Sequence, residues 1–278
     1  MSATSGVGTE FVRDGIAAYR RHDYRRAEQI YAAWTRSEPG NADAWNNLAV
    51  MLKLQRKFAA ALACCRRALA LAPDNLLALG NLGNLLKTTG RPGEACRLLE
   101  SALERAPDDA GLHYNLACAL SADGRVEAAL AVVERAIALD PANGQYRFDR
   151  AVFRLRLGDY LAAWTDFEYR WSHKRARPRT FQSPAWDGSD PRGKRLFIHA
   201  EQGFGDNLLA ARFLPAIQGL GAHVILECRP ELLSLFRELS GVDECIVEGD
   251  REPQCDWQCP IMSLPGRCRV TLESIPPP

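Results

Sequence analysis

Apolar and small residues in the first 170 residues follow a helical pattern that restarts every 34 residues. Leu48, Leu82 and Leu116 form one column of this pattern. Prolines and alanines keep the same interval, at Pro39, Pro73, Pro107 and Pro141 and at Ala27, Ala61, Ala95, Ala129 and Ala163. A period of this length predicts a row of helical pairs that bury their apolar sides against one another.

The turns and the end units fit the same frame. Glycines fall between the two helices of a unit, where a positive φ ends the first helix, at Gly90, Gly124 and Gly158. The frame gives five units, at residues 8–41, 42–75, 76–109, 110–143 and 144–177. Asp14 and Arg150 interrupt the leucine column, and Trp34 and Arg170 interrupt a second alanine column. End units are expected to differ because one side of each does not meet a copy of itself.

Three motifs carry a family resemblance: Asn46-Asn47-Leu48-Ala49, Gly80-Asn81-Leu82-Gly83 and Tyr114-Asn115-Leu116-Ala117, each followed by a proline. They resemble the tetratricopeptide repeat (TPR), a helix–turn–helix unit of 34 residues. The resemblance implies an α-solenoid over residues 8–177. It also implies a protein or peptide partner in the concave groove lined by the first helices.

Asn47, Asn81 and Asn115 take the same position in three successive first helices, which predicts a row of amides. Such a row resembles the asparagine ladder of the repeat domain of O-linked N-acetylglucosamine transferase, where the amides hold the backbone of an extended peptide. The alternative is that each amide bonds within its own repeat. If the row binds peptide, neutral hydrogen bonds of about 0.5–1.5 kcal/mol each give weak, sequence-tolerant binding.

The pattern changes after residue 177. Residues 178–195 are predicted to be a linker, and residues 196–278 a Rossmann-like parallel half-domain with strands at 196–200, 224–227 and 245–247 and a further strand within 257–262. The basic residues near the linker indicate either a solvated segment or a positive lip beside a phosphate-bearing ligand. They are Lys174, Arg175, Arg177, Arg179, Arg192, Lys194 and Arg195.

The loop after the first strand is the predicted ligand or phosphate loop, because parallel sheets bind ligands beyond the carboxyl ends of their strands. Its candidate residues are Glu201, Gln202, Gly203, Gly205 and Asn207. A dinucleotide site would use Gly203 and Gly205, with Glu227 on the ribose. The third glycine of that fingerprint is replaced by Leu208, which weakens the dinucleotide interpretation.

Separated motifs carry a second resemblance: Phe181 to Gly188, Glu201 to Asp206, Gly221 to Glu227, Gly241 to Asp243 and Cys259 to Pro265. Together with the repeats they resemble bacterial TPR proteins fused to a heptosyltransferase-like (family 9) glycosyltransferase domain. The resemblance implies Asp206 as a general base and a nucleotide sugar as donor. The alternative is that Asp206 caps a helix beginning at Asn207.

A two-Rossmann transferase needs a second sheet for its donor, and 31 residues follow Val247. We therefore expect the donor-binding half to be absent and this chain alone to be inactive. A nucleotide sugar would be a partner only if that half were supplied. The favoured function is a scaffold that binds protein or peptide through the repeats.

The composition of the chain mainly argues against certain partners and cofactors. A net charge of +1 argues against a nucleic-acid partner, and no apolar run predicts a membrane partner. Nine cysteines without a disulfide-scaffold spacing indicate reduced thiols in a cytoplasmic protein, here of bacterial type. Cys255 and Cys259 form one close pair, too few ligands for zinc, so no metal or cofactor is predicted. The sheet edge predicts self-association, as a homo-oligomer, or docking onto the repeats.

Overall fold

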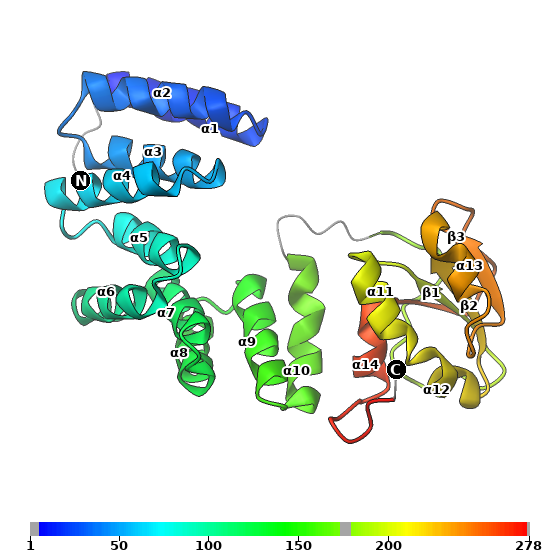
Figure 1. Cartoon of the computed structure of the whole chain (residues 1–278). Helices are drawn as coiled ribbons and strands as arrows, with labels where there is room; N and C mark the ends of the chain where they lie inside the picture. The colour runs from blue at the N-terminus through cyan, green and yellow to red at the C-terminus, as the bar shows by residue number, and fades with distance from the viewer. Residues whose placement is uncertain (1–5, 173–178, 277–278) are drawn as a thin grey trace. The chain divides into compact units, whose positions relative to one another are not determined.

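The computed structural model describes residues 6–172 and 179–276 (Figure 1). By packing, the chain divides into two compact units, residues 1–142 and 143–278. The fifth helical pair keeps the repeat period but belongs to the second unit. The boundary expected at residue 177 is where the 34-residue period of the sequence ends. The boundary at residue 142 is where contacts between the two parts of the chain are fewest.

The first unit contains four antiparallel helical pairs (Figure 1). They are α1 (Gly6–Arg20), α2 (Tyr24–Ser37), α3 (Ala42–Leu54), α4 (Phe58–Leu71), α5 (Leu76–Thr88), α6 (Pro92–Arg105), α7 (Ala110–Ala122) and α8 (Val126–Leu139). Among the first helices, α3 contacts α5 and α5 contacts α7. We call the side formed by α1, α3, α5 and α7 the first-helix face.

Local chemistry fixes where these helices begin. Asn41 Oδ1 accepts hydrogen bonds from the backbone nitrogens of Asp43 and Ala44, and caps α3. Asn75 and Asp109 cap α5 and α7 in the same way. These residues are spaced by the repeat period, so α3, α5 and α7 each start with an oxygen that satisfies an otherwise unpaired backbone N–H.

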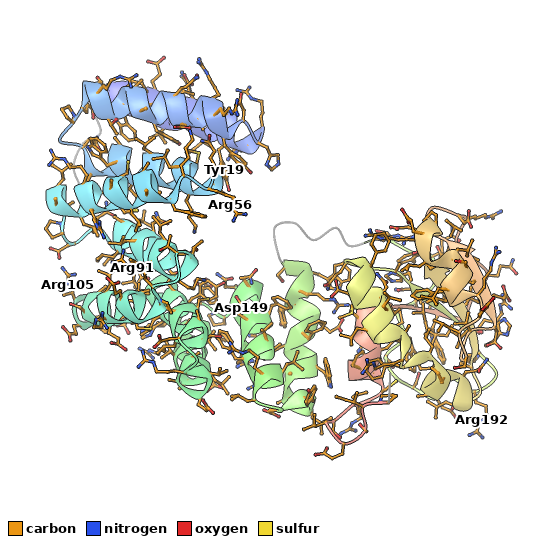
Figure 2. The ribbon with its side chains drawn as sticks, viewed as in Figure 1. Tyr19, Arg56, Arg91, Arg105, Asp149 and Arg192 are labelled. Carbon is orange, nitrogen blue, oxygen red and sulfur yellow. The ribbon has the colours of Figure 1, made fainter. Side chains whose placement is uncertain are left out.

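The turn within each pair has a left-handed backbone. Gly90 and Gly124 have φ of 76° and 86°, as predicted. The equivalent positions in the first two repeats hold His22 and Arg56, each with φ of 60°. Figure 2 labels Arg56 in the turn after α3. The turn geometry therefore persists where the sequence lacks glycine, although a side chain there is strained.

Small residues allow the helices of the first unit to approach closely. Ala27, Ala61, Ala95 and Ala129 are completely buried. Gly83 marks a close approach of two helices, because a Cβ atom at this position would lie 2.8 Å from Leu99 Cδ1. The predicted alanine columns thus mark the solenoid core.

The second unit combines a helical pair with a parallel sheet (Figure 1). The pair is α9 (Gly144–Arg156) and α10 (Tyr160–Phe167), followed by the 3₁₀ turn η1 (Glu168–Ser172). The strands are β1 (Arg195–His199), β2 (His223–Cys228), β3 (Glu244–Val247) and β4 (Trp257–Pro260), in the order β3-β2-β1-β4 with every pairing parallel. The predicted fold class, repeats followed by a small parallel sheet, is confirmed.

The helices around the sheet are short. The segment after β1 forms α11 (Phe204–Ala211) and α12 (Leu214–Gly219), with Pro215 in the first turn of α12. Further on are η2 (Pro230–Leu232), α13 (Leu233–Phe236), η3 (Ile261–Ser263) and α14 (Leu264–Arg267). Within α11, Leu208 and Leu209 are 44% and 52% exposed, whereas Ala210 and Ala211 join the core.

Different segments of the chain pack against the two faces of the sheet. Leu196 and Ile198 point into the main core, with the helices that follow the strands. Residues 179–186, which we call the strap, cover part of the opposite face and then pair with the edge of β4 through Ala185 and Gln258. Trp186, at the end of the strap, belongs to the main core. The ring of Phe181 packs against Phe197 and His199, with centroids 5.6 and 4.4 Å apart. Residues from 179 on, predicted to be a linker, are therefore part of the α/β fold.

Candidate functional site

The asparagine row lies on the first-helix face. Asn47, Asn81 and Asn115 belong to α3, α5 and α7, and each side chain is half-buried. Asn81 Nδ2 donates to Asn46 Oδ1 of the preceding repeat at 2.8 Å. Asn46 is itself 5% exposed, so it fixes the orientation of the Asn81 amide. The sequence interpretation missed Asn46, although it directly precedes Asn47 in the motif.

The Asn115 amide has a different support. The residue equivalent to Asn46 in the next repeat is Gly80, and a Cβ atom there would lie 2.8 Å from Asn115 Nδ2. Gly80 therefore makes room for the amide without bonding it. Within the described residues, neither the Asn47 nor the Asn115 side chain has a hydrogen bond. An amide offers two donors and an acceptor, so these half-buried groups retain unused hydrogen-bonding capacity.

The second candidate site lies at the carboxyl ends of β1 and β4. The chain proceeds from β1 to β3 on one side and returns to β4 on the other, which makes the gap between β1 and β4 the switch point of the sheet. Glu201 lies there, with a side chain 4% exposed. Its carboxylate accepts hydrogen bonds from Arg170 Nε and Nη2 at 3.0 and 2.8 Å, and from Met262 N at 2.9 Å.

Arg170 comes from η1, at the end of the helical pair, and is 5% exposed. It also donates to Ser263 Oγ at 2.7 Å and to Glu168 Oε1 at 3.1 Å. Arg170 thus neutralises Glu201 and joins the helical pair to the sheet at the predicted ligand position. In the sequence, this role is indicated by Arg170 standing where the second, third and fourth repeats have alanine.

The loop itself is held by Asn207, which is 2% exposed. Its Nδ2 donates to the carbonyls of Glu201 and Gly203 at 2.8 and 2.7 Å. Gln202 has a left-handed backbone, with φ of 59°. Gln202, Gly203 and Gly205 are exposed. The structure therefore brings the predicted loop residues together, with Asn207 as the internal brace.

The alternative interpretation of Asp206 as an N-cap is wrong in its position. Helix α11 begins at Phe204, and Asp206 lies within its first turn. Asp206 Oδ2 accepts a hydrogen bond from Gly203 N at 3.0 Å, so the carboxylate stabilises the helix start from the third helical position. This contact is compatible with an additional chemical role, which stays a prediction.

Glu227, the candidate ribose contact, is engaged by the strap. Arg179 binds both of its carboxylate oxygens, with Nη2 2.9 Å from Oε1. The Glu227 side chain is 1% exposed. Two further basic residues of the predicted lip form ion pairs. Lys194 contacts Asp256, and Arg195 contacts Glu244. Lys174, Arg175 and Arg177 lie outside the described residues.

His199 lies beneath the strap, 4% exposed. Its Nε2 atom is 3.0 Å from Gln258 Oε1, and its Nδ1 atom has no partner within the described residues. Burial lowers the pKa of His199 to about 4, against a weaker opposing effect of the Gln258 hydrogen bond. The imidazole is therefore neutral near pH 7.

The cysteines do not converge on one site in the described part of the chain. Cys259 is buried in the sheet core, whereas Cys255 Sγ lies 3.0 Å from Ser183 Oγ in the strap. Cys228 and Cys245 are 3.5 Å apart, Sγ to Sγ, on adjacent strands. Among the described residues no group of three or more potential metal ligands occurs. None of the described helices is both long enough and apolar enough to span a membrane.

Comparisons with known families identify the repeats. A tetratricopeptide repeat model matches residues 42–75, and another matches residues 86–147. These segments are tetratricopeptide repeats, which confirms the first resemblance. Both models end before the α/β part, so its resemblance to heptosyltransferase-like enzymes stays a prediction.

Individual known proteins are similar to only part of this chain. Protein FlbA of Caulobacter vibrioides is 40% identical over 88 residues, which are 31% of this chain and 15% of that protein. A thermophilic TPR protein of Thermus thermophilus has a TM-score of 0.54 at 20% identity, over 60% of this chain and 91% of that chain. PilW, a widely conserved type IV pilus biogenesis factor, has a TM-score of 0.55 at 23% identity, over 61% and 78%. At these identities the structural likeness is one of fold.

Proposed function

We propose that the repeats form a scaffold that binds an extended segment of a protein or peptide along the first-helix face. The observation that supports this most is the asparagine row with its unused hydrogen-bonding capacity. Asn81 is oriented by Asn46, and Asn115 rests over Gly80, so both amides have a fixed place before a partner arrives. Fixed groups lose less conformational entropy on binding.

The spacing of the row suits a peptide backbone. Packed helices lie about 8–10 Å apart, and an extended chain advances about 3.3 Å per residue. Successive amides can therefore contact every third peptide bond or so. The amides bind backbone groups that every sequence possesses, so the row itself supplies affinity with little selectivity.

A selection experiment tests this function. Random peptides displayed on phage are selected on the full chain, and the enriched peptides are synthesised and measured by fluorescence anisotropy. We expect Asn81→Ala and Asn115→Ala to weaken binding by about five- to tenfold each, which corresponds to about 1 kcal/mol per lost hydrogen bond. Gln29→Ala is the matched control, because Gln29 is an exposed amide on α2, a second helix.

Two results would oppose the scaffold function. The first is enrichment of no peptide above background on the folded chain. The second is a set of peptides that lose affinity with Gln29→Ala but not with the two asparagine variants. That second result would move the binding surface to the second helices.

Sugar transfer is the second candidate, supported by the β3-β2-β1-β4 parallel order and by Asp206 beside the carboxyl end of β1. In this role Asp206 would act as general base, with Glu201, Gln202, Gly203, Gly205 and Asn207 shaping the acceptor loop. A nucleotide sugar would be held by a donor half supplied in addition. Turnover of a nucleotide sugar that disappears with Asp206→Asn would support it. Unchanged turnover in that variant would remove Asp206 from the role.

Self-association is a further proposal for the sheet. β4 carries an isolated parallel bridge between Ala185 and Gln258, whereas β3 is the edge strand. An edge strand offers unpaired backbone groups to a second copy. Analytical ultracentrifugation of the full chain would detect a dimer, and a Pro substitution at Ile246 should then restore the monomer.

A further inference from the structure

Two thiols of the second unit are in contact across neighbouring strands. Cys228 is the last residue of β2, and Cys245 is the second residue of β3. Their Sγ atoms lie 3.5 Å apart, and both cysteines are free. Neither the repeats nor the candidate loop after β1 accounts for this pair.

The register of the two strands explains why these side chains meet. Leu226 pairs with Cys245, and Cys228 pairs with Val247, in the parallel ladder between β2 and β3. Side chains two residues apart on a strand point to the same face, so Cys228 lies on the face of Leu226. Cys228 belongs to the main core on this face, and Cys245 packs against that core.

The two thiols differ in their access to solvent. Cys228 is 1% exposed, whereas Cys245 is partly exposed. Strand β3 lies at the edge of the sheet, and none of its residues is fully buried. An S–S bond of about 2.0 Å requires the sulfurs to move about 1.5 Å closer together. Because β3 pairs on one side only, it can move by this distance without breaking a second ladder.

We propose that Cys228 and Cys245 form a reversible disulfide that fixes the edge strand β3 to β2 when the chain meets an oxidising low-molecular-weight disulfide. The site is a modification site of the second unit, and it does not rest on peptide binding by the repeats. Oxidised glutathione is the oxidant that represents this chemical class. In its absence the pair remains as two thiols.

The reaction consists of two thiol–disulfide exchanges. Cys245, the more accessible thiol, loses its proton and attacks one sulfur of oxidised glutathione, whose S–S bond breaks; the departing glutathione thiolate takes up a proton. Cys228 then loses its proton and attacks Cys245 Sγ, and the second glutathione thiolate leaves and is protonated. Two protein thiols are oxidised to one disulfide, and one glutathione disulfide is reduced to two thiols.

Burial makes this a slowly reacting pair. It raises the pKa of Cys228 to about 12 and also raises the pKa of Cys245, while the charge of Arg237 opposes both effects. The thiolate is the attacking form, and it is scarce far below the pKa. Oxidation of the folded chain should therefore accelerate as the pH rises from 7 to 9, by up to about tenfold per unit.

Peptide mapping of the full chain tests the bond. The folded chain is equilibrated with mixtures of reduced and oxidised glutathione, and free thiols are then blocked with N-ethylmaleimide in urea. Cleavage after Arg212 and Arg237 gives peptides 213–237 and 238–251, each with one cysteine. We expect these peptides to be joined in the oxidised samples and separate, each with one maleimide, in the reduced samples.

Variants and thermal unfolding test the effect on β3. Oxidation of the parent should raise the unfolding temperature of the second unit by about 5–10 °C, because the bond closes the loop of residues 229–244. Cys245→Ser should not respond to the oxidant. Cys255→Ser is the matched control, because Cys255 is also partly buried but lies beside Ser183 Oγ at 3.0 Å, and it should respond as the parent does.

Three results would overturn the disulfide site. The first is recovery of the two peptides separately at every glutathione ratio. The second is a joined pair that forms only when the chain is unfolded in urea, because the folded contact would then not direct it. The third is a joined pair in the folded chain that leaves the unfolding temperature unchanged, because β3 would then not be fixed by the bond.

Discussion

The third repeat and the fifth helical pair share one sequence period but have different cores. In the third repeat, Leu82 and Ala102 are buried among apolar neighbours, with 7% and 0% exposure. The equivalent residues of the fifth pair are Arg150 and Arg170, and both form ion pairs. The period is therefore preserved while the chemistry of the interior changes.

The surfaces against which the third repeat and the fifth helical pair pack explain why their interiors differ. The third repeat packs against copies of itself, which complement small apolar columns. The fifth pair packs against the α/β sheet, where Arg170 reaches Glu201. Within the pair, Arg150 and Arg154 both donate to Asp166, which is 4% exposed. Departures from a repeat consensus can thus mark the surface that joins a solenoid to another domain.

Removal of Arg170 should have the largest effect on this difference. Arg170→Met leaves the Glu201 carboxylate buried without a cation, which should destabilise the second unit by about 3–5 kcal/mol. Hydrogen exchange of the β1 and β2 amides measures the opening free energy of the sheet. Arg135→Met is the control, since Arg135 and Asp108 form an exposed pair, and should change stability by less than about 1 kcal/mol.

A rescue variant identifies the cause. Adding Glu201→Gln to Arg170→Met removes the uncompensated charge but keeps an acceptor for Met262 N. Partial recovery of the exchange protection is expected. If the double variant is no more protected than Arg170→Met, lost packing rather than the buried charge determines the effect.

Gly83 provides the matching test in the repeats. Gly83→Ala places a Cβ atom against the buried Leu99, so we expect destabilisation by about 1–3 kcal/mol through overpacking. The equivalent pairs of the neighbouring repeats are Ala49 with Cys65 and Ala117 with Val133. Leu99→Val should therefore recover part of the loss in Gly83→Ala. Additive losses in a double-mutant cycle, measured by urea unfolding, would contradict a direct steric conflict.

Acid should weaken the second unit through His199. The folded pKa of about 4 is below the ordinary value of 6.5, so the unfolded chain binds more protons between these values. The contribution of His199 to stability is present above pH 6.5 and is lost as pH falls towards 4. Between pH 7 and pH 5 the loss is about 2 kcal/mol. In His199→Gln, hydrogen exchange of β1 should show a smaller difference between these pH values than in the parent; an identical difference would exclude His199 as the source.

The turn positions should show the smallest effects, with opposite signs. Gly90→Ala forces a side chain into a left-handed backbone and should destabilise the first unit by about 1 kcal/mol. Arg56→Gly removes such a side chain and should stabilise it by up to about 1 kcal/mol. Thermal unfolding measures the stability of both variants relative to the parent chain. Destabilisation by Arg56→Gly would show that its side chain, which lies over the Phe58 ring, contributes more than the strain.

Features that repeat along the chain could be predicted from the sequence. The alanine columns, the glycine turns and the strand at Trp257 follow from period and local propensity, because each position has the same role in every unit or strand. The contact of Arg170 with Glu201 could not be predicted, since it joins residues whose proximity depends on tertiary packing. The same holds for the strap: its composition is that of a linker, and its role depends on a sheet face that no following helix covers.

Binding of an extended peptide segment along the first-helix face can be followed by nuclear magnetic resonance of the isotope-labelled full chain, titrated with a peptide enriched in the phage selection. We expect this binding to shift the side-chain amide signals of Asn47, Asn81 and Asn115. Shifts confined to α2, α4 and α6, or an unchanged asparagine row at saturation, would contradict it.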